Sequence, residues 1–159
     1  MAADLPSLND DLPMPPDLVV EEVNDAETLM TWCQIASEVF ELHPVAAEAW
    51  PGIFASVPFG PGKVHRHYLA RLGGVPVGTS SVYYGAGVAG ISSVATVPEA
   101  RRKGVGSAVT LEPLKEARRL GYRIATLFSS EMAVSMYQKL GFKEYCRCSL
   151  YLWIPAPLD

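Results

Sequence analysis

A strand, a glycine turn and the start of a helix follow one another in residues 94–107, which read Val94-Ala95-Thr96-Val97-Pro98-Glu99-Ala100-Arg101-Arg102-Lys103-Gly104-Val105-Gly106-Ser107. The first N–H groups of a helix have no partner inside the helix, and the helix dipole favours negative charge at that end. Glycine has no Cβ, so a phosphate can approach the backbone closely at Gly104 and Gly106. The stretch therefore predicts an anion-binding site.

The elements before this stretch are predicted from the spacing of apolar residues and from turn signals. Asn24 followed by Glu27 is a capping-box pattern that begins a helix, and His43-Pro44 ends that helix. Gly73-Gly74 is typical of a hairpin turn. We expect a strand over 18–23, a helix through 29–40, a second short helix over 45–54 that Pro51-Gly52 interrupts, and three strands over 65–71, 75–84 and 88–97.

The elements after this stretch are two helices and two strands. Pro113 lies inside the first helix, where it removes a hydrogen bond and predicts a kink. Ser129 or Ser130 caps the second helix, and Gly141 closes it. The order β-α-α-β-β-β-α-β-α-β is typical of a mixed sheet with helices on its faces, which is the α+β class. We expect a helix over 105–117 that ends at Gly121, a strand over 122–128, a helix through 133–140 and a strand over 142–154.

Length and composition indicate one domain that follows an N-terminal arm. The chain has 159 residues, which is enough for one core. Residues 1–17 are rich in Pro and Asp and bury little alone, so we predict an arm over 1–17, ordered only if it lies on the body or a partner, and a single domain over 18–159. Residues 1–22 carry six acids and no Lys or Arg, which leaves eleven acids and thirteen basic residues in the rest. That balance lacks the broad basic face of a nucleic-acid binder, so we expect no nucleic-acid partner.

Cysteine usage and hydropathy point to a cytoplasmic protein. No apolar run approaches the roughly 20 residues of a membrane helix, and the N-terminus lacks a signal-peptide pattern, so we expect no membrane partner. Cys33, Cys146 and Cys148 form an odd, sparse set that is typical of reduced thiols. Two cysteines close together, Cys146 and Cys148, make a poor metal site, so we expect no metal.

Three phosphate-binding patterns compete for the glycine turn. A P-loop requires Gly-x-x-x-x-Gly-Lys-[Ser/Thr], whereas Lys103 precedes the first glycine here. A dinucleotide fingerprint requires a third glycine, and Val109 stands at that place. The pattern [Arg/Gln]-x-x-Gly-x-[Gly/Ala] is met by Arg101, Gly104 and Gly106.

Two blocks of this sequence resemble the GNAT (Gcn5-related N-acetyltransferase) superfamily. Val97-Pro98-x-x-Arg101-Arg102-Lys103-Gly104-Val105-Gly106 is similar to its acetyl-CoA signature. Ala133-x-x-x-Tyr137-x-Lys139-Leu140-Gly141-Phe142 is similar to its late helix and the turn into the next strand. The separation of the blocks and the element order also match, so the resemblance covers nearly all the chain except the arm. It implies the GNAT-like acyl-CoA N-acyltransferase fold, with acetyl-CoA as co-substrate.

The resemblance also implies roles for residues in and near the two blocks. Main-chain groups of Ala95 and Val97 are expected to hydrogen-bond the pantetheine arm like an added strand. The N–H groups of 102–107 are expected to hold the pyrophosphate, and Arg102 or Lys103 adds charge at the ribose phosphate. The expected cofactor-binding residues are Ala95, Val97, Arg102, Lys103, Gly104, Val105, Gly106, Ser107 and Ser130, the last standing where the family often has an Asn.

Tyr137 is the predicted catalytic residue, with an ordinary core aromatic as the alternative. A thiolate leaving group needs a proton, and a phenol with a pKa of about 10 is protonated at neutral pH and can donate one. The general base is left open, because the strand before the glycine turn offers Ser92 and Ser93 where many family members have an acid. The candidates are Glu38, Glu41, His65 and His67, with Tyr83 and Tyr84 nearby.

Two functions from different classes fit these residues. The first is an N-acetyltransferase that moves an acetyl group from acetyl-CoA to a primary amine, expected to be a small molecule, by direct attack on the thioester. The second is a non-catalytic acyl-CoA-binding sensor module, which the missing strand carboxylate favours. Dimerisation is common in the superfamily, and Tyr151 and Trp153 on the terminal strand would give a homodimer an apolar face. The identity of the acceptor amine stays open.

Overall fold

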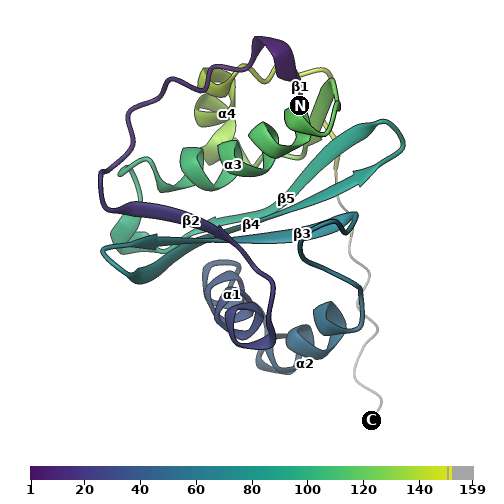
Figure 1. The fold of residues 1–159 in the computed structure, drawn as a ribbon. Helices are drawn as coiled ribbons and strands as arrows, with labels where there is room; N and C mark the ends of the chain where they lie inside the picture. The colour runs from purple at the N-terminus through teal and green to yellow at the C-terminus, as the bar shows by residue number, and fades with distance from the viewer. Residues whose placement is uncertain (150, 152–159) are drawn as a thin grey trace.

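One mixed sheet runs through the molecule and carries helices on both faces (Figure 1). The computed structural model describes residues 1–149 and residue 151. Its strands lie in the order β1-β6-β5-β4-β3-β2, in which β5 and β6 are parallel and all other neighbours are antiparallel. The expected α+β class with a mixed sheet is thereby confirmed. The elements are β1 (Ala2–Asp4), β2 (Leu18–Glu22), α1 (Ala26–Val39), α2 (Pro44–Ala55), β3 (His65–Leu72), β4 (Val75–Gly85), β5 (Val88–Thr96), α3 (Val105–Arg119), β6 (Ile124–Leu127) and α4 (Val134–Leu140).

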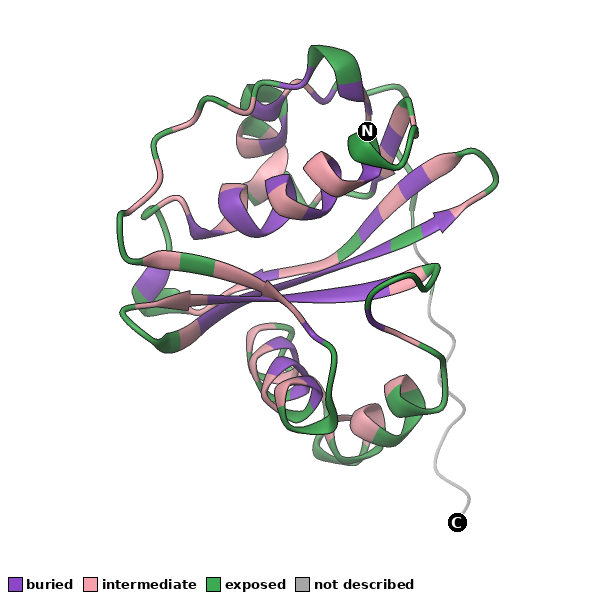
Figure 2. Ribbon diagram, viewed as in Figure 1, coloured by how far each residue is buried: buried purple, intermediate pink, exposed green. Residues whose placement is uncertain are grey.

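Helices α1 and α2 cover one face of the sheet, and α3 and α4 cover the other (Figure 1). Buried residues, purple in Figure 2, concentrate where the helices meet the sheet. On the α1 face, Trp32 is fully buried and its indole Nε1 donates a hydrogen bond to the Ser80 carbonyl at 3.0 Å. On the α3 face, Leu111 and Leu114 are buried in the main core. Each such leucine contributes about 1.5–3 kcal/mol to the free energy of folding.

Helix α1 begins one residue later than the capping-box pattern predicted. Asp25, not Asn24, is the N-cap, and its Oδ1 accepts a hydrogen bond from the Thr28 N–H at 2.8 Å. The chain leaves the sheet only after Val23, whose N–H still donates to the His67 carbonyl at 2.8 Å. Asp caps a helix as well as Asn does, so the later exit from the sheet decides which of them is used.

Two prolines lie inside continuous helices. Helix α2 runs through Pro51, so the predicted interruption at Pro51-Gly52 was wrong. Helix α3 runs through Pro113, which has no N–H to donate to the Val109 carbonyl four residues earlier. The Ser80 hydroxyl on β4 donates to that carbonyl instead, at 2.6 Å. Because the strand supplies the missing donor, the helix tolerates the proline; the kink expected at Pro113 stays a prediction.

Residues 1–17 lie against the body of the protein. Strand β1 pairs with β6, and the Met1 amino group donates to the Leu127 carbonyl at 2.7 Å. Leu5 and Leu8 are buried in the main core. The Asn9 side-chain amide donates to the Lys139 carbonyl in the last turn of α4, at 3.0 Å. The division into an arm over 1–17 and a domain over 18–159 stays a prediction.

The strand predicted over 142–154 does not form in the described part of that range, residues 142–149 and 151. Lys143 makes only a single bridge, with Ala2. The reason is that β1 already pairs with the outer edge of β6, so that edge is not free for the chain after Phe142. Residues 150 and 152–154, including Trp153 on the expected dimer face, lie outside the described residues.

Among the described residues, no helix combines the length and the apolar character that a membrane crossing needs. Cys33, Cys146 and Cys148 are free thiols, the first buried and the other two exposed. Burial raises the pKa of the Cys33 thiol to about 11. That thiol is therefore protonated at neutral pH and acts as a small core residue.

Candidate active site

The divergence of β5 and β6 opens the sheet on the carboxyl side of both strands. Their parallel pairing extends only from Val88↔Ile124 to Ile91↔Leu127, whereas β5 continues to Thr96. Within the described residues, the later half of β5 therefore has no strand neighbour on the side away from β4. An unpaired strand edge presents N–H and C=O groups that an extended ligand can bind as an added strand.

A β-bulge marks the place where β5 departs from β6. Ser93 and Val94 together stand opposite one residue of β4, which shifts the register of the pair. Ser93 has a φ of 51°, in the left-handed region that residues with a side chain rarely adopt. The Thr79 hydroxyl holds it there by donating to the Ser93 carbonyl at 3.0 Å. Bulges bend a strand and re-aim its side chains, which fits the change of course at this point.

The glycine turn presents backbone donors at the N-terminus of α3. Gly104 is the N-cap residue with a φ of 82°, and Arg102 also has a positive φ of 61°. The Ala108 N–H donates to the Gly104 carbonyl at 3.0 Å. The N–H groups of residues 105–107 precede this first helical bond and have no helical acceptor, so they are available to an anion.

Basic side chains surround these donors. Arg101, Arg102 and Lys139 line the adjacent cavity, and no Asp or Glu of the described chain does so. The Arg101 Nε donates to the Thr96 carbonyl at 3.3 Å and thereby ties the turn to the end of β5. Positive charge beside free N–H groups suits a ligand that carries several phosphates.

Gly106 allows α4 to approach the turn closely. A Cβ at this position would lie 2.9 Å from the Met136 sulfur and 3.6 Å from the Thr96 hydroxyl. Met136 itself lines the cavity. A side chain at position 106 would therefore displace Met136 and change the shape of the cavity wall.

Tyr137 on α4 forms the opposite wall. Its ring is only 4% exposed and packs edge-on against Phe142, with the ring centroids 5.8 Å apart. Burial raises the pKa of the Tyr137 phenol to about 12, although a hydrogen bond with the Thr110 hydroxyl acts in the opposite direction. Thr110 also donates to the Gly106 carbonyl at 2.7 Å, which links the phenol to the turn. The phenol is therefore protonated at neutral pH and can serve as a general acid.

These parts enclose a cavity of about 940 Å³, which lies in the size range of small-molecule and cofactor sites. It brings together residues from the end of α1, the later half of β5, the glycine turn and α4. Of the predicted site residues, those that line the cavity are Ala95, Arg102, Gly104, Gly106, Ser107, Ser130 and Tyr137.

Three predicted binding residues do not line the cavity. The Val97 N–H donates to the Val77 carbonyl at 3.0 Å, and the Val97 carbonyl accepts from the Ala100 N–H at 3.0 Å. Val105 is buried in the core, and Lys103 is exposed on the surface of the turn. The binding roles given to these three residues and to six of the seven that line the cavity, and the catalytic role given to Tyr137, stay predictions.

Sequence reasoning missed the wall that α1 contributes. Val39 and Phe40 line the cavity, and Phe40 is 42% exposed. An apolar pair at the end of a helix carries no signal of which strand it faces. Met132 and Met136 were also missed, although their spacing of four residues would place them on one side of a helix.

None of the four candidate bases lines the cavity. Glu38 and Glu41 are exposed at the end of α1 and just beyond it. His67 is fully buried, its Nδ1 lies 2.7 Å from the Ser81 Oγ, and burial lowers its pKa to about 3. The His65 ring centroid lies 4.4 Å from that of His67, and burial also lowers the His65 pKa. Both histidines are thus neutral members of an aromatic core.

A family model described as the acetyltransferase (GNAT) domain matches residues 63–144. No curated protein shows significant sequence similarity to this chain. Among solved structures, a GCN5-related N-acetyltransferase from Kribbella flavida is 25% identical with a TM-score of 0.68, over 89% of this chain and 52% of that one. This chain thus spans about half the length of the Kribbella protein.

Two further solved structures share the fold. A predicted acetyltransferase with acetyl-CoA from Clostridium acetobutylicum is 14% identical with a TM-score of 0.67, over 85% of this chain and 96% of that one. An aminoglycoside acetyltransferase from an uncultured soil metagenomic sample, in complex with trehalose, is 16% identical with a TM-score of 0.69, over 87% and 97%. The family model covers half of the chain, including the glycine turn and Tyr137, so the chain belongs to the GNAT family of acetyltransferases, which use acyl-CoA.

Proposed function

We propose that this protein moves the acetyl group of acetyl-CoA to a primary amine of a small molecule, by direct attack of the amine on the thioester. One observation carries the proposal. Tyr137, a protonated phenol, shares a single cavity with the anion-binding turn at Gly104 and Gly106. A general acid and a site for the phosphates of the donor therefore face the same space.

The residues of the cavity fit the parts of acetyl-CoA in order. The free edge of β5 at Ala95 would bind the amide groups of pantetheine, and the N–H groups of residues 105–107 would bind the pyrophosphate. Arg102 adds charge beside the phosphates, and Ser130 offers a hydroxyl on the opposite side. Acetyl-CoA supplies the activated thioester, and the protein supplies orientation and proton transfer.

Proton movements define the roles of the side chains. The amine must be neutral when its nitrogen attacks the carbonyl carbon of the thioester. The carbon–sulfur bond breaks as the new amide bond forms. Tyr137 donates its phenolic proton to the departing sulfur. Because no carboxylate or imidazole of the described chain lines the cavity, we assign removal of the amine proton to water, and Tyr137 regains a proton from water before the next turnover.

The cavity walls support a small-molecule acceptor. Val39, Phe40 and Met132 form an apolar side, which suits the carbon skeleton of a compact amine. One of the compared proteins is named as an aminoglycoside acetyltransferase, so the same fold accommodates a small amine in a relative.

A second candidate function is a non-catalytic acyl-CoA-binding module of the same family. The observation that favours it is the lack of a base: within the described residues, no Asp, Glu or His lines the cavity. A module of this kind would bind CoA at the glycine turn without releasing free thiol.

The test combines thiol release from acetyl-CoA across a panel of small amines with a thermal shift on adding CoA. Tyr137→Phe should lower kcat by about 100-fold, the lower end expected for loss of a general acid, while the thermal shift is kept. Tyr145→Phe, at an exposed tyrosine, is the matched control and should leave kcat unchanged. A shift without thiol release would support the module, and no shift with CoA would contradict both functions.

A further inference from the structure

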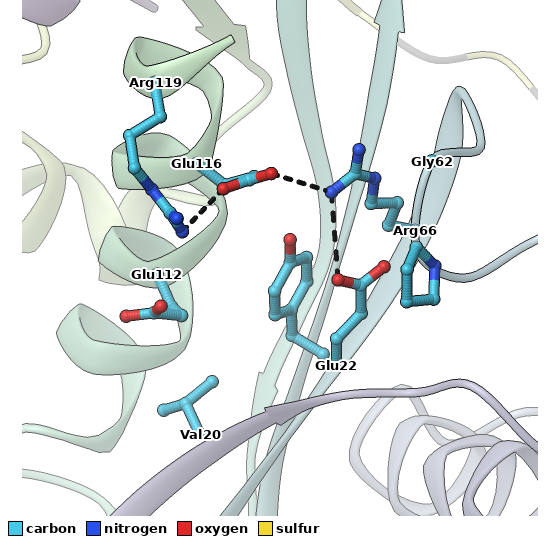
Figure 3. Close-up of a pocket in the computed structure, with 9 residues that line it drawn as sticks. Val20, Glu22, Gly62, Arg66, Glu112, Glu116 and Arg119 are labelled. Atoms are coloured by element: carbon cyan, nitrogen blue, oxygen red, sulfur yellow. Dashed lines mark hydrogen bonds and ion pairs between the residues drawn. The ribbon is translucent and has the colours of Figure 1, made fainter.

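A second cavity lies between α3 and the strands β2 and β3 (Figure 3). Its volume is about 480 Å³, which is within the range of small-ligand sites. Pro61 and Gly62 line it and are exposed, so it is open to solvent. It shares no lining residue with the active-site cavity. Its polar lining residues are Glu22, Arg66, Tyr68, Glu112, Glu116 and Arg119.

The two cations of this cavity are already paired. The Arg66 Nη1 lies 3.1 Å from the Glu116 Oε1, and Arg119 forms an ion pair with the other oxygen of Glu116 (Figure 3). A second, longer contact of 3.8 Å joins Arg66 to the Glu22 Oε2. Glu112 has no ion pair within the described residues. Three carboxylates thus face two guanidinium groups, and the surplus charge is negative.

Two buried oxygen atoms in the lining have no hydrogen-bond partner within the described residues. They are the Glu22 Oε1 and the Tyr68 hydroxyl, and Tyr68 is only 3% exposed. Burial raises the pKa of Glu22 and, more strongly, that of Tyr68, to which the neighbouring Tyr84 hydroxyl also contributes; the acceptor lone pairs of the Tyr68 oxygen are left without a donor in the described chain. A buried polar atom without a partner is unfavourable, and native proteins rarely leave one without a structural or functional reason. Both atoms can accept a hydrogen bond.

We propose that this cavity binds a small primary ammonium ion. Its N–H groups would donate to the Glu22 Oε1 and the Tyr68 oxygen, and Glu112 would balance its charge. Arg66 contacts the other oxygen of this carboxylate, Glu22 Oε2, at 3.8 Å, which leaves Oε1 for such a ligand.

Other ligand classes fit this cavity less well. An anion would have to displace Glu116 from both arginines. A metal ion needs several ligands within bonding distance, and no three carboxylate, imidazole or thiolate groups of the described chain converge in that way. An organic ammonium ion, with separate N–H donors around one charge, matches the acceptor character of the free atoms and the negative sign of the lining.

The experiment titrates the 159-residue chain with 1,4-diaminobutane, and it measures the shifts of backbone amides by NMR and the heat of binding by calorimetry. We expect shifts at Glu22, Tyr68 and Glu112, and binding that weakens as salt is raised. Glu22→Gln and Glu112→Gln should each weaken binding by about tenfold, as for loss of a charge-assisted hydrogen bond. Glu48→Gln, an exposed acid on α2, is the control and should change nothing.

Several results would overturn the proposal. They are equal binding of the neutral probe 1,4-butanediol, unchanged affinity in the Glu112→Gln variant, and a preference for magnesium chloride over the diamine. Shifts confined to the surroundings of Val39 and Ala95 would mean that the amine occupies the active-site cavity only, which would overturn the proposal. Because binding is measured without acetyl-CoA, failure here leaves the proposed acetyl transfer untouched, and failure of acetyl transfer leaves this site untouched.

Discussion

The substitution Ser80→Ala removes the hydroxyl that supplies the hydrogen bond that Pro113 in α3 cannot donate. The Ser80 hydroxyl donates to the Val109 carbonyl at 2.6 Å, and both residues are fully buried. Because position 113 is proline, the helix has no N–H of its own for that carbonyl. Without the hydroxyl the carbonyl stays buried and unpaired, which should lower the free energy of unfolding by about 1–3 kcal/mol.

The cost of this change should depend on residue 113. In the Pro113→Ala background, the restored N–H at that position can donate to the Val109 carbonyl, so Ser80→Ala should cost less than about 1 kcal/mol. Pro113→Ala alone has two opposing effects on the free energy of unfolding. The helix regains a hydrogen bond, but a small void forms because Pro113 is buried. The coupling between the two substitutions is therefore the informative quantity, and we expect about 1–2 kcal/mol.

Urea unfolding of the four proteins, followed by circular dichroism, gives this coupling. For Ser80→Ala, a loss near 2 kcal/mol corresponds to a fall in Tm of roughly 4–8 °C in a chain of this size. Ser37→Ala is the matched control, because the Ser37 hydroxyl is buried without a partner in the described part of the chain. That variant should change stability by less than about 0.5 kcal/mol. Equal costs of Ser80→Ala in both backgrounds would refute the reasoning.

Two further predictions concern the turn and the buried histidine. Gly104→Ala must place a side chain at a φ of 82°. It should therefore lower the free energy of unfolding by about 1–2 kcal/mol and reduce the thermal shift with CoA. The control is Gly52→Ala on α2, where a Cβ meets nothing within 4 Å, and it should leave that shift unchanged. The folded-state pKa of His67 lies near 3, below its ordinary value of 6.5, so the unfolded chain binds a proton first as pH falls. The stability that is present above pH 6.5 should therefore be lost toward pH 4, by up to about 1.4 kcal/mol per pH unit. His67→Gln should reduce this slope, as measured by urea unfolding at several pH values. An unchanged slope would contradict the conclusion that His67 is neutral in the folded protein.

Local chemistry explains what the sequence predicted well. The glycine turn was placed correctly because Pro98 ends a β-branched run and Gly104 is needed where the backbone enters the left-handed region. The α+β class followed in the same way, from periodicity and turn residues that act within a few positions. Tyr137 was found near the turn only through the resemblance of two blocks, since no local rule brings α4 to the end of β5.

The errors arose where a distant partner decides the structure. The Ala2–Asp4 segment is too short to show a period, yet it pairs with β6, more than 100 residues away in sequence, and takes the edge expected for 142–154. Composition could not show which residues of 1–17 meet the body, where Leu5 and Leu8 enter the main core; the division into an arm and a domain stays a prediction. Phe40 faces the cavity for the same kind of reason, because only the packing of α1 on the sheet aims it there.

The anion site depends on contacts far along the helix that carries it. Three residues of α3 accept hydrogen bonds from neighbouring strands. The carbonyls of Val109 and Pro113 accept from side chains on β4, and the Glu116 carboxylate accepts from a side chain on β3. Residues spaced by four and three lie on one side of a helix, so these bonds fix which side faces the sheet. Apolar packing tolerates small rotations, but directional hydrogen bonds at 2.6–3.1 Å do not. A rotation of α3 about its axis would leave its first N–H groups pointing along that axis, but it would carry residues 105–107 around it, roughly 15 Å from Glu116 at 1.5 Å per residue. The strand contacts thus fix where around the helix axis the turn presents its donors.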